Sequence, residues 1–197
     1  MKKILTIACL FVFALSMSSS LNAQEELKWP DVDKSVMDMA YFPARIAFRG
    51  FAKTDEEKKA LPAIRVVYSR PMKNDRDIFG DLVKYGDVWR AGANESTEIL
   101  FYKDVKVGGT KLKKGRYTIH VVPNEKEWEV HFSSDLDRWG SYSFDPNTST
   151  LAKIKVPTEK TSETLEAFAI MFQGVDGGAH MIMGWDNTMV RVPINFK

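Results

Sequence analysis

Residues 116–132, RYTIHVVPNEKEWEVHF, carry the pattern that decides the fold. Apolar and aromatic side chains recur at every second position on both sides of Pro123-Asn124. Alternation with a period of two is typical of a β-strand with one buried face, and Pro and Asn are common turn residues. The stretch therefore predicts two antiparallel strands joined as a hairpin.

The same alternation recurs along the chain, with turn residues between the runs. We expect further strands at residues 63–69, 98–102, 151–156, 165–172, 180–185 and 189–196. Short strands at regular spacing are typical of all-β sandwiches and barrels. The sequence predicts an all-β fold, a single antiparallel β-sandwich of the jelly-roll or immunoglobulin-like type, with little helix.

Helical signals are weak. Thr54 is followed three residues later by Glu57, which is a capping-box pattern, but residues 54–60 lack an apolar face and stop before Pro62. We expect only a short surface turn there. At most one more helical turn is expected over residues 77–83, where Gly80 weakens it.

The N-terminus has the pattern of an export signal. Lys2 and Lys3 precede an apolar run at residues 4–15, and small or polar residues follow up to Ala23. The run is shorter than the ~20 residues that span a bilayer, although a retained anchor is the alternative. We expect a signal peptide at residues 1–23, an N-terminal extension at 24–36 and one β-sandwich domain at 37–197, located in the bacterial periplasm or outside the cell.

Removal of the signal peptide would change the composition in two ways. Cys9 is the only cysteine, so the remaining 174 residues would hold none, which excludes thiol and disulfide chemistry. Lys2 and Lys3 also account for the formal charge of +2, so those residues would be neutral. A neutral chain without a basic run is a poor match for nucleic acid or an anionic membrane surface, and we expect no membrane span after cleavage.

Catalytic and cofactor motifs are not found in the sequence. It has no Gly-x-Ser-x-Gly elbow, no Ser-x-x-Lys motif and no glycine-rich phosphate loop, and we expect no cofactor. Pairing of the two hairpin strands would place His120 opposite His131, where a third ligand such as Glu129 or His180 would complete a metal site. The alternative is that both rings only fill space on the second face of the hairpin, and we expect no metal.

A cluster of polar and aromatic residues surrounds the stretch YGDVWRAGANEST, residues 85–97. Its arginines and amides could hydrogen-bond a polar ligand while its tryptophans stack on it. The alternative is a salt-bridge network that fixes a long loop, with Glu95 or Asp87 as the acidic partner. The candidate ligand-binding residues are Arg70, Arg76, Trp89, Arg90, Asn94, Glu95, Thr97 and Trp139.

These residues lie in a motif that resembles the domain-of-unknown-function 2911 family of exported bacterial proteins. The resemblance is carried by Tyr68-Ser69-Arg70-Pro71, Arg76, Ile78-Phe79-Gly80, Leu82-Val83, Tyr85-Gly86, Val88-Trp89-Arg90, Gly92-Ala93-Asn94-Glu95 and Thr97. It continues through Lys103-Asp104-Val105, residues 114–118, Pro123, Trp128, Asp135, Trp139-Gly140 and Trp185. The resemblance extends from about Met37 to Phe196. It implies export and a mainly β domain, and it implies no reaction, substrate or cofactor.

Three functions remain open at this stage. The favoured one is a non-catalytic module that binds a small polar or carbohydrate ligand. The second is a hydrolase of envelope material or polysaccharide, with Glu95 as general acid or base next to Arg90 and Asn94. The third is a purely structural envelope protein, whose arginines would be fully paired beneath packed side chains. The sequence does not predict an oligomeric state.

Overall fold

The computed structural model describes residues 27–196, so the expected signal peptide lies outside the described residues. Asp33–Lys197 form one compact unit. None of the described residues belongs to a helix that is long and apolar enough to cross a membrane.

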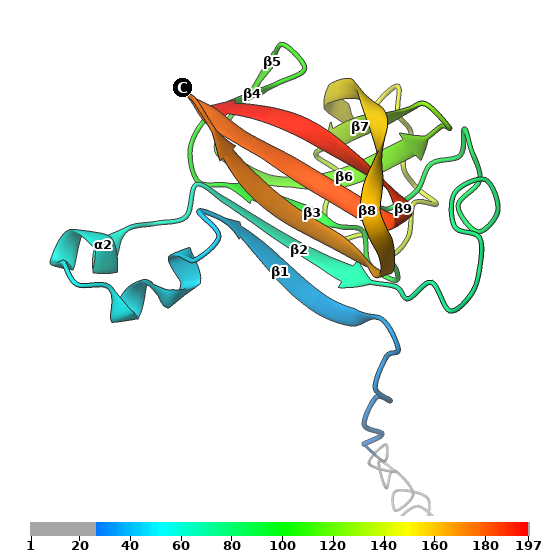
Figure 1. Cartoon of the computed structure of the whole chain (residues 1–197), viewed down its shortest axis with the longest axis horizontal. Helices are drawn as coiled ribbons and strands as arrows, with labels where there is room; N and C mark the ends of the chain where they lie inside the picture. The colour runs from blue at the N-terminus through cyan, green and yellow to red at the C-terminus, as the bar shows by residue number, and fades with distance from the viewer. Residues whose placement is uncertain (1–26, 197) are drawn as a thin grey trace, which may run out of the picture. The chain divides into compact units, whose positions relative to one another are not determined.

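Strands dominate this unit (Figure 1). The strands of residues 27–196 are β1 (Val36–Phe42), β2 (Ile64–Arg70), β3 (Glu98–Phe101), β4 (Val105–Val107), β5 (Thr110–Leu112), β6 (Gly115–Pro123), β7 (Glu127–Ser133), β8 (Thr150–Val175) and β9 (Gly178–Phe196). Two short helices, the 3₁₀-helix η1 (Ile46–Phe51) and α2 (Asp55–Lys59), lie between β1 and β2 and project from the strands. The predicted all-β fold with little helix is confirmed.

All strand pairs are antiparallel, in the order β1-β2-β3-β6-β7-β8-β9-β4-β5. Strand β8 belongs to two layers, because its residues 150–157 pair with β7 and its residues 158–175 run along β9. The second half of β8 packs over β2, where the Tyr68 hydroxyl accepts a hydrogen bond from the Ile170 amide at 3.0 Å. The sheet thus folds over itself into the predicted antiparallel sandwich.

Strands β8 and β9 are longer than their sequence patterns predict. Each merges two predicted strands, and the β8–β9 register shifts between Lys160 and Leu165 and again between Leu165 and Ala169. Asp186, which falls between the strands expected at residues 180–185 and 189–196, lies within β9 with a positive φ of 54°. These irregularities interrupt the alternation without ending the strand, because bulges bend and twist a strand that remains paired.

Other local predictions had mixed outcomes. The Thr54–Glu57 capping box is present at the start of α2. Residues 77–83 do not form the expected helical turn; they form successive turns in which Phe79 bridges Val83. Strands β1, β4 and β5 were not predicted, because β4 and β5 have only three residues each and β1 is an edge strand without a fully buried residue.

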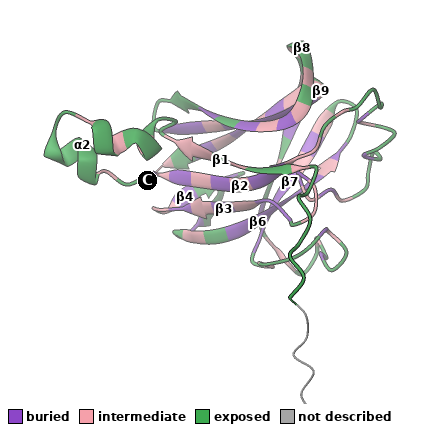
Figure 2. Ribbon diagram, turned by 90° about the horizontal axis from the view of Figure 1, so that it is seen from below, coloured by how far each residue is buried: buried purple, intermediate pink, exposed green. Residues whose placement is uncertain are grey.

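The core lies between the two layers, and its buried residues line the inner faces of β2, β6, β7, β8 and β9 (Figure 2). Trp128 and Trp185 are among its largest fully buried side chains. Around them Phe79, Trp89 and Phe168 form one aromatic cluster with ring centroids 4.7–6.5 Å apart. This cluster reaches the surface at the end of the sandwich where β2 ends, and it forms the base of the candidate site.

Candidate functional site

An open cleft of about 710 Å³ lies beyond the end of β2. This volume is typical of sites for small molecules. Its walls come from two parts of the long loop between β2 and β3, from the residues just before β1 and from β9. The lining residues are Lys34, Ser35, Pro71, Met72, Asn74, Arg76, Leu82, Val83, Lys84, Asp87, Val88, Trp89, Arg90, Gly92, Ala93 and Trp185.

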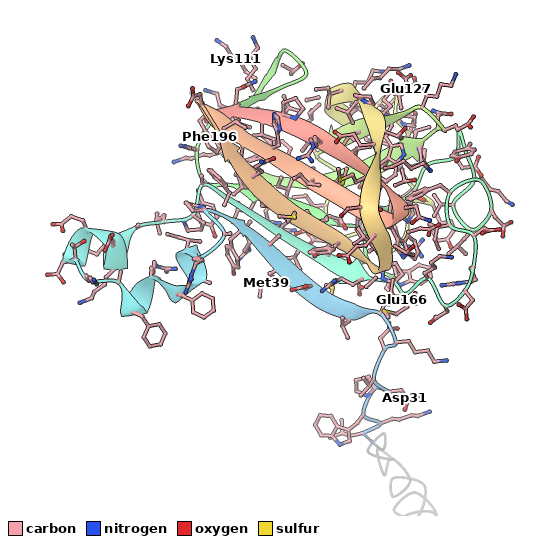
Figure 3. All side chains as sticks on the ribbon, viewed as in Figure 1. Asp31, Met39, Lys111, Glu127, Glu166 and Phe196 are labelled. Carbon is pink, nitrogen blue, oxygen red and sulfur yellow. The ribbon has the colours of Figure 1, made fainter. Side chains whose placement is uncertain are left out.

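The wall that follows β2 is fixed to β8. The Lys73 amide donates to the Glu166 carbonyl at 2.6 Å, and the Asn74 amide donates to the Glu166 carboxylate at 2.9 Å. Glu166 is labelled in Figure 3 at the end of the sheet where β2 ends. Arg76 closes this turn with hydrogen bonds to the carbonyl oxygens of Met72 and Lys73. The wall is therefore anchored to Glu166 of β8 through one backbone bond and one side-chain bond.

The opposite wall is fixed by Trp89. Its backbone amide and carbonyl bond to Val121 of β6 at 2.7 and 2.8 Å, and its indole Nε1 donates to the Gly92 carbonyl at 3.1 Å. The ring stacks on Trp185 with centroids 6.0 Å apart. Because only 8% of Trp89 is exposed, the residue is both part of the core and the base of the cleft.

The cleft has an excess of positive charge. Its lining holds four cationic side chains, those of Lys34, Arg76, Lys84 and Arg90, and one carboxylate, that of Asp87. Lys84 is paired with the exposed Asp81 at 3.2 Å. Lys34, Arg76 and Arg90 form no ion pair with any described residue. The Nε atom of Arg90 is buried and has no hydrogen-bond partner among the described residues. Such an arrangement favours an anionic ligand.

Of the eight candidate residues, three line the cleft: Arg76, Trp89 and Arg90. Arg70 does not, because it pairs with Asp38 of β1 at 3.0 Å and donates to the Phe168 carbonyl at 3.0 Å. Neither acid suggested by the sequence is its partner. Thr97 is buried, and its hydroxyl donates to the Ala91 carbonyl at 2.6 Å. Arg70 thus connects β2 to β1 and β8, and Thr97 fixes the loop before β3.

Asn94, Glu95 and Trp139 lie next to the cleft, where two loops cross. The Gly140 amide donates to the Asn94 carbonyl at 2.8 Å, and Glu95 forms an antiparallel bridge with Trp139. Glu95 is exposed, and it makes no ion pair with any described arginine. The loop after β7 is thereby attached to the loop that contains Arg90.

Two aromatic rings on this second loop remain open to solvent. Trp139 is 59% exposed and Tyr142 is 80% exposed, and their rings stack with centroids 5.8 Å apart and planes 19° apart. The Arg90 guanidinium carbon lies 5.8 Å from the centre of the Trp139 ring. This distance is within the range of a cation–π contact. Arg90 therefore lies in contact with both the cleft and the stacked pair.

Several residues of this region lie outside the set of candidates predicted from the sequence. Lys34 lies in the predicted extension, and Trp185 is remote in sequence, so only the fold places them in the cleft. Lys84 directly precedes the motif at residues 85–97, so its position and its positive charge could have marked it as a candidate ligand-binding residue. Tyr142 follows Trp139 by three residues in a loop, where spacing alone predicts no stacking.

The predicted pairing of the two histidines is confirmed, and neither residue lines the cleft. Val121 pairs with Val130, which sets His120 opposite His131. Both imidazoles are buried, and the Phe144 ring stacks on His120 with centroids 3.9 Å apart. Within residues 27–196 no three His, Cys, Asp or Glu side chains are grouped so as to hold a metal ion.

The comparison with protein families gave one match. The profile of the family described as "Protein of unknown function (DUF2911)" matches residues 52–194, which include most of the cleft and both loops beside it. No curated protein and no solved structure matches the chain significantly. Because the matched region covers well over half of the sequence, the chain belongs to the DUF2911 family of proteins of unknown function.

Proposed function

We propose that this protein is a non-catalytic module that binds a small polar or carbohydrate ligand in the cleft beyond β2. The observation that carries the proposal is the arrangement of Arg76 and Arg90 around an aromatic base. Both guanidinium groups lack a carboxylate partner among the described residues, and Trp89 and Trp185 line the same cleft. Guanidinium groups fork onto carboxylates and polar oxygens, and aromatic rings pack against the apolar faces of sugars.

The position of Glu95 gives no support to the alternative hydrolase. Glu95 does not line the cleft, and it forms a backbone bridge on the neighbouring loop. A general acid or base must come within about 2.6–3.2 Å of the proton that it transfers. Asp87 is the only carboxylate in the lining, and a single acid is not the pair that most glycosidases use. We therefore favour binding over hydrolysis.

A binding screen with matched variants tests the proposal. Residues 24–197 would be screened by thermal shift and calorimetry against neutral sugars, hexuronic acids and small carboxylic acids. Arg76→Gln and Arg90→Gln should each weaken binding by about tenfold or more, because a hydrogen bond to a charged group is worth about 1.5–3 kcal/mol. Lys111→Gln, on β5 and labelled far from Glu166 in Figure 3, is the control for a lost charge. If none of these compounds binds, or if the double arginine variant retains full affinity, the proposal is wrong.

We also propose that the chain is exported and that this module acts in the periplasm or outside the cell. The support is the order of two lysines, an apolar run and small residues in residues 1–23. Expression of the full chain in a bacterium, followed by N-terminal sequencing of the exported form, should give a chain that begins at Gln24. A product that keeps residues 1–23 and sediments with membranes would instead support a retained anchor.

A further inference from the structure

We infer that the ligand of the cleft is an acidic oligosaccharide. The inference rests on the function proposed above and adds the charge and the length of the ligand. One acidic sugar would lie among the cations of the cleft. The chain would then pass Arg90 and continue onto the exposed rings of Trp139 and Tyr142.

The excess positive charge of the cleft favours a ligand that carries a carboxylate. Lys34, Arg76 and Arg90 have no carboxylate partner among the described residues, and Asp87 is the one acid in the lining. A neutral sugar would displace water from these groups without neutralising them, which is unfavourable for a desolvated cation. A carboxylate on the ligand would receive charge-assisted hydrogen bonds from the same groups. The cleft therefore favours an acidic sugar over a neutral one.

The length of the ligand follows from the position of Arg90. This residue lines the cleft, and its guanidinium group also lies 5.8 Å from the centre of the Trp139 ring. Tyr142 stacks on Trp139, so a continuous surface leads from the cations to two exposed aromatic rings. Exposed apolar groups with a polar rim commonly mark interaction sites, and sugar rings present apolar C–H faces to such rings. A ligand of several sugar rings would contact both parts at once.

The stacked pair is held in place by backbone geometry rather than by chance contact. Gly140 has a φ of +73°, and a Cβ atom there would lie 2.5 Å from Cε2 of Tyr142. The Tyr142 ring thus packs directly against the backbone of Gly140. The Ser96 hydroxyl donates to the Gly140 carbonyl, and the Ser141 hydroxyl donates to the Val88 carbonyl at 3.1 Å. These bonds fix the loop that carries both rings to the loop that carries Arg90.

Calorimetry with four probes tests the inference on residues 24–197. The probes are galacturonate, tetragalacturonate, the neutral maltotetraose and the peptide tetraglutamate. Tetragalacturonate should bind about tenfold or more tightly than the monomer, the factor expected for added aromatic contacts. It should also bind more tightly than maltotetraose, which lacks charge, and than tetraglutamate, which lacks sugar rings. Added salt should weaken its binding, because it screens the attraction.

Variants assign the two parts of the site. Trp139→Ala and Tyr142→Ala should each weaken tetragalacturonate binding by about tenfold and leave galacturonate binding unchanged. Arg76→Gln should weaken the binding of both. Phe51→Ala, at the end of η1 and 89% exposed, is the control for loss of an exposed aromatic ring.

The outcomes separate this inference from the proposed function. Galacturonate binding that depends on Arg76, without any gain from a longer chain or loss in Trp139→Ala, overturns the inference and leaves the proposed function intact. Equal or tighter binding of maltotetraose or tetraglutamate also overturns the inference. If no sugar and no small acid binds, both proposals fail.

Discussion

Trp89→Ala should destabilise the protein by about 3–5 kcal/mol, the usual cost of removing a large buried aromatic side chain. The Trp89 ring touches four other aromatic residues, and only 8% of the residue is exposed. Its removal leaves a cavity in the cluster at the base of the cleft. It also leaves the Gly92 carbonyl without its indole partner. Urea unfolding of residues 24–197, followed by tryptophan fluorescence or circular dichroism, measures the change.

Trp139→Ala is the matched control, because it removes the same side chain from an exposed position. Trp139 is 59% exposed, and its ring contacts are with Arg90 and Tyr142 at the surface. Its loss should therefore cost less than about 1 kcal/mol. Equal destabilisation by the two changes would contradict the assignment of Trp89 to the core and of Trp139 to the surface.

Acidification from about pH 6.5 to pH 4 should destabilise the protein by about 3 kcal/mol through His120 alone. Burial lowers the pKa of His120 to about 4, from the ordinary value of 6.5. Asp135 opposes this shift by favouring the charged ring, whereas the neighbouring His131 adds to it. Within residues 27–196 neither nitrogen of His120 has a hydrogen-bond partner, and the Phe144 ring covers one face.

The direction of this pH effect follows from the difference in proton binding between the folded and the unfolded chain. Between the two pKa values of His120, the unfolded chain binds a proton that the folded chain does not, so a falling pH favours unfolding. Above about pH 6.5 both states are neutral at this site and the penalty vanishes. Burial also lowers the pKa of His131, while Glu129 acts to raise it and Lys153 to lower it further. The two buried histidines therefore act in the same direction.

His120→Phe should remove most of this acid sensitivity, because phenylalanine can keep the stack on Phe144 and binds no proton. The free energy of unfolding, measured in urea at pH 7 and pH 4, should fall less in His120→Phe than in the parent by about 3 kcal/mol. His180→Gln is the control, because it removes a histidine of β9 that is only partly buried. An unchanged pH dependence in His120→Phe would show that other groups cause the acid sensitivity.

Prediction of the fold worked where one face of a strand is buried. Alternation at residues 116–132 predicted not only two strands but their register, and therefore the position of His120 opposite His131. The same rule missed β1, in which no residue is fully buried. It also divided β8 into two strands, because the polar residues between Lys160 and Leu165 lie at a bulge and do not alternate.

The site was harder to predict, because the sequence does not show which arginines have an acidic ion-pair partner in the fold. Arg70 and Arg90 are equally cationic in the sequence, yet the first pairs with Asp38 of β1 and the second has no acidic partner among the described residues. That difference depends on β1, which brings Asp38 alongside β2. Sequence spacing cannot supply it, because the two residues of the pair are 32 positions apart.

The sequence by itself determined the all-β fold, the antiparallel hairpin and the family, since all three depend on local alternation and on a motif contiguous in the chain. Tertiary structure alone decided which tryptophan is a core residue and which arginines are available to a ligand. The physical reason is that burial and ion pairing depend on what the fold brings together. Trp89 has aromatic neighbours on β7, β8 and β9, whereas the Trp139 ring has none of these and remains exposed.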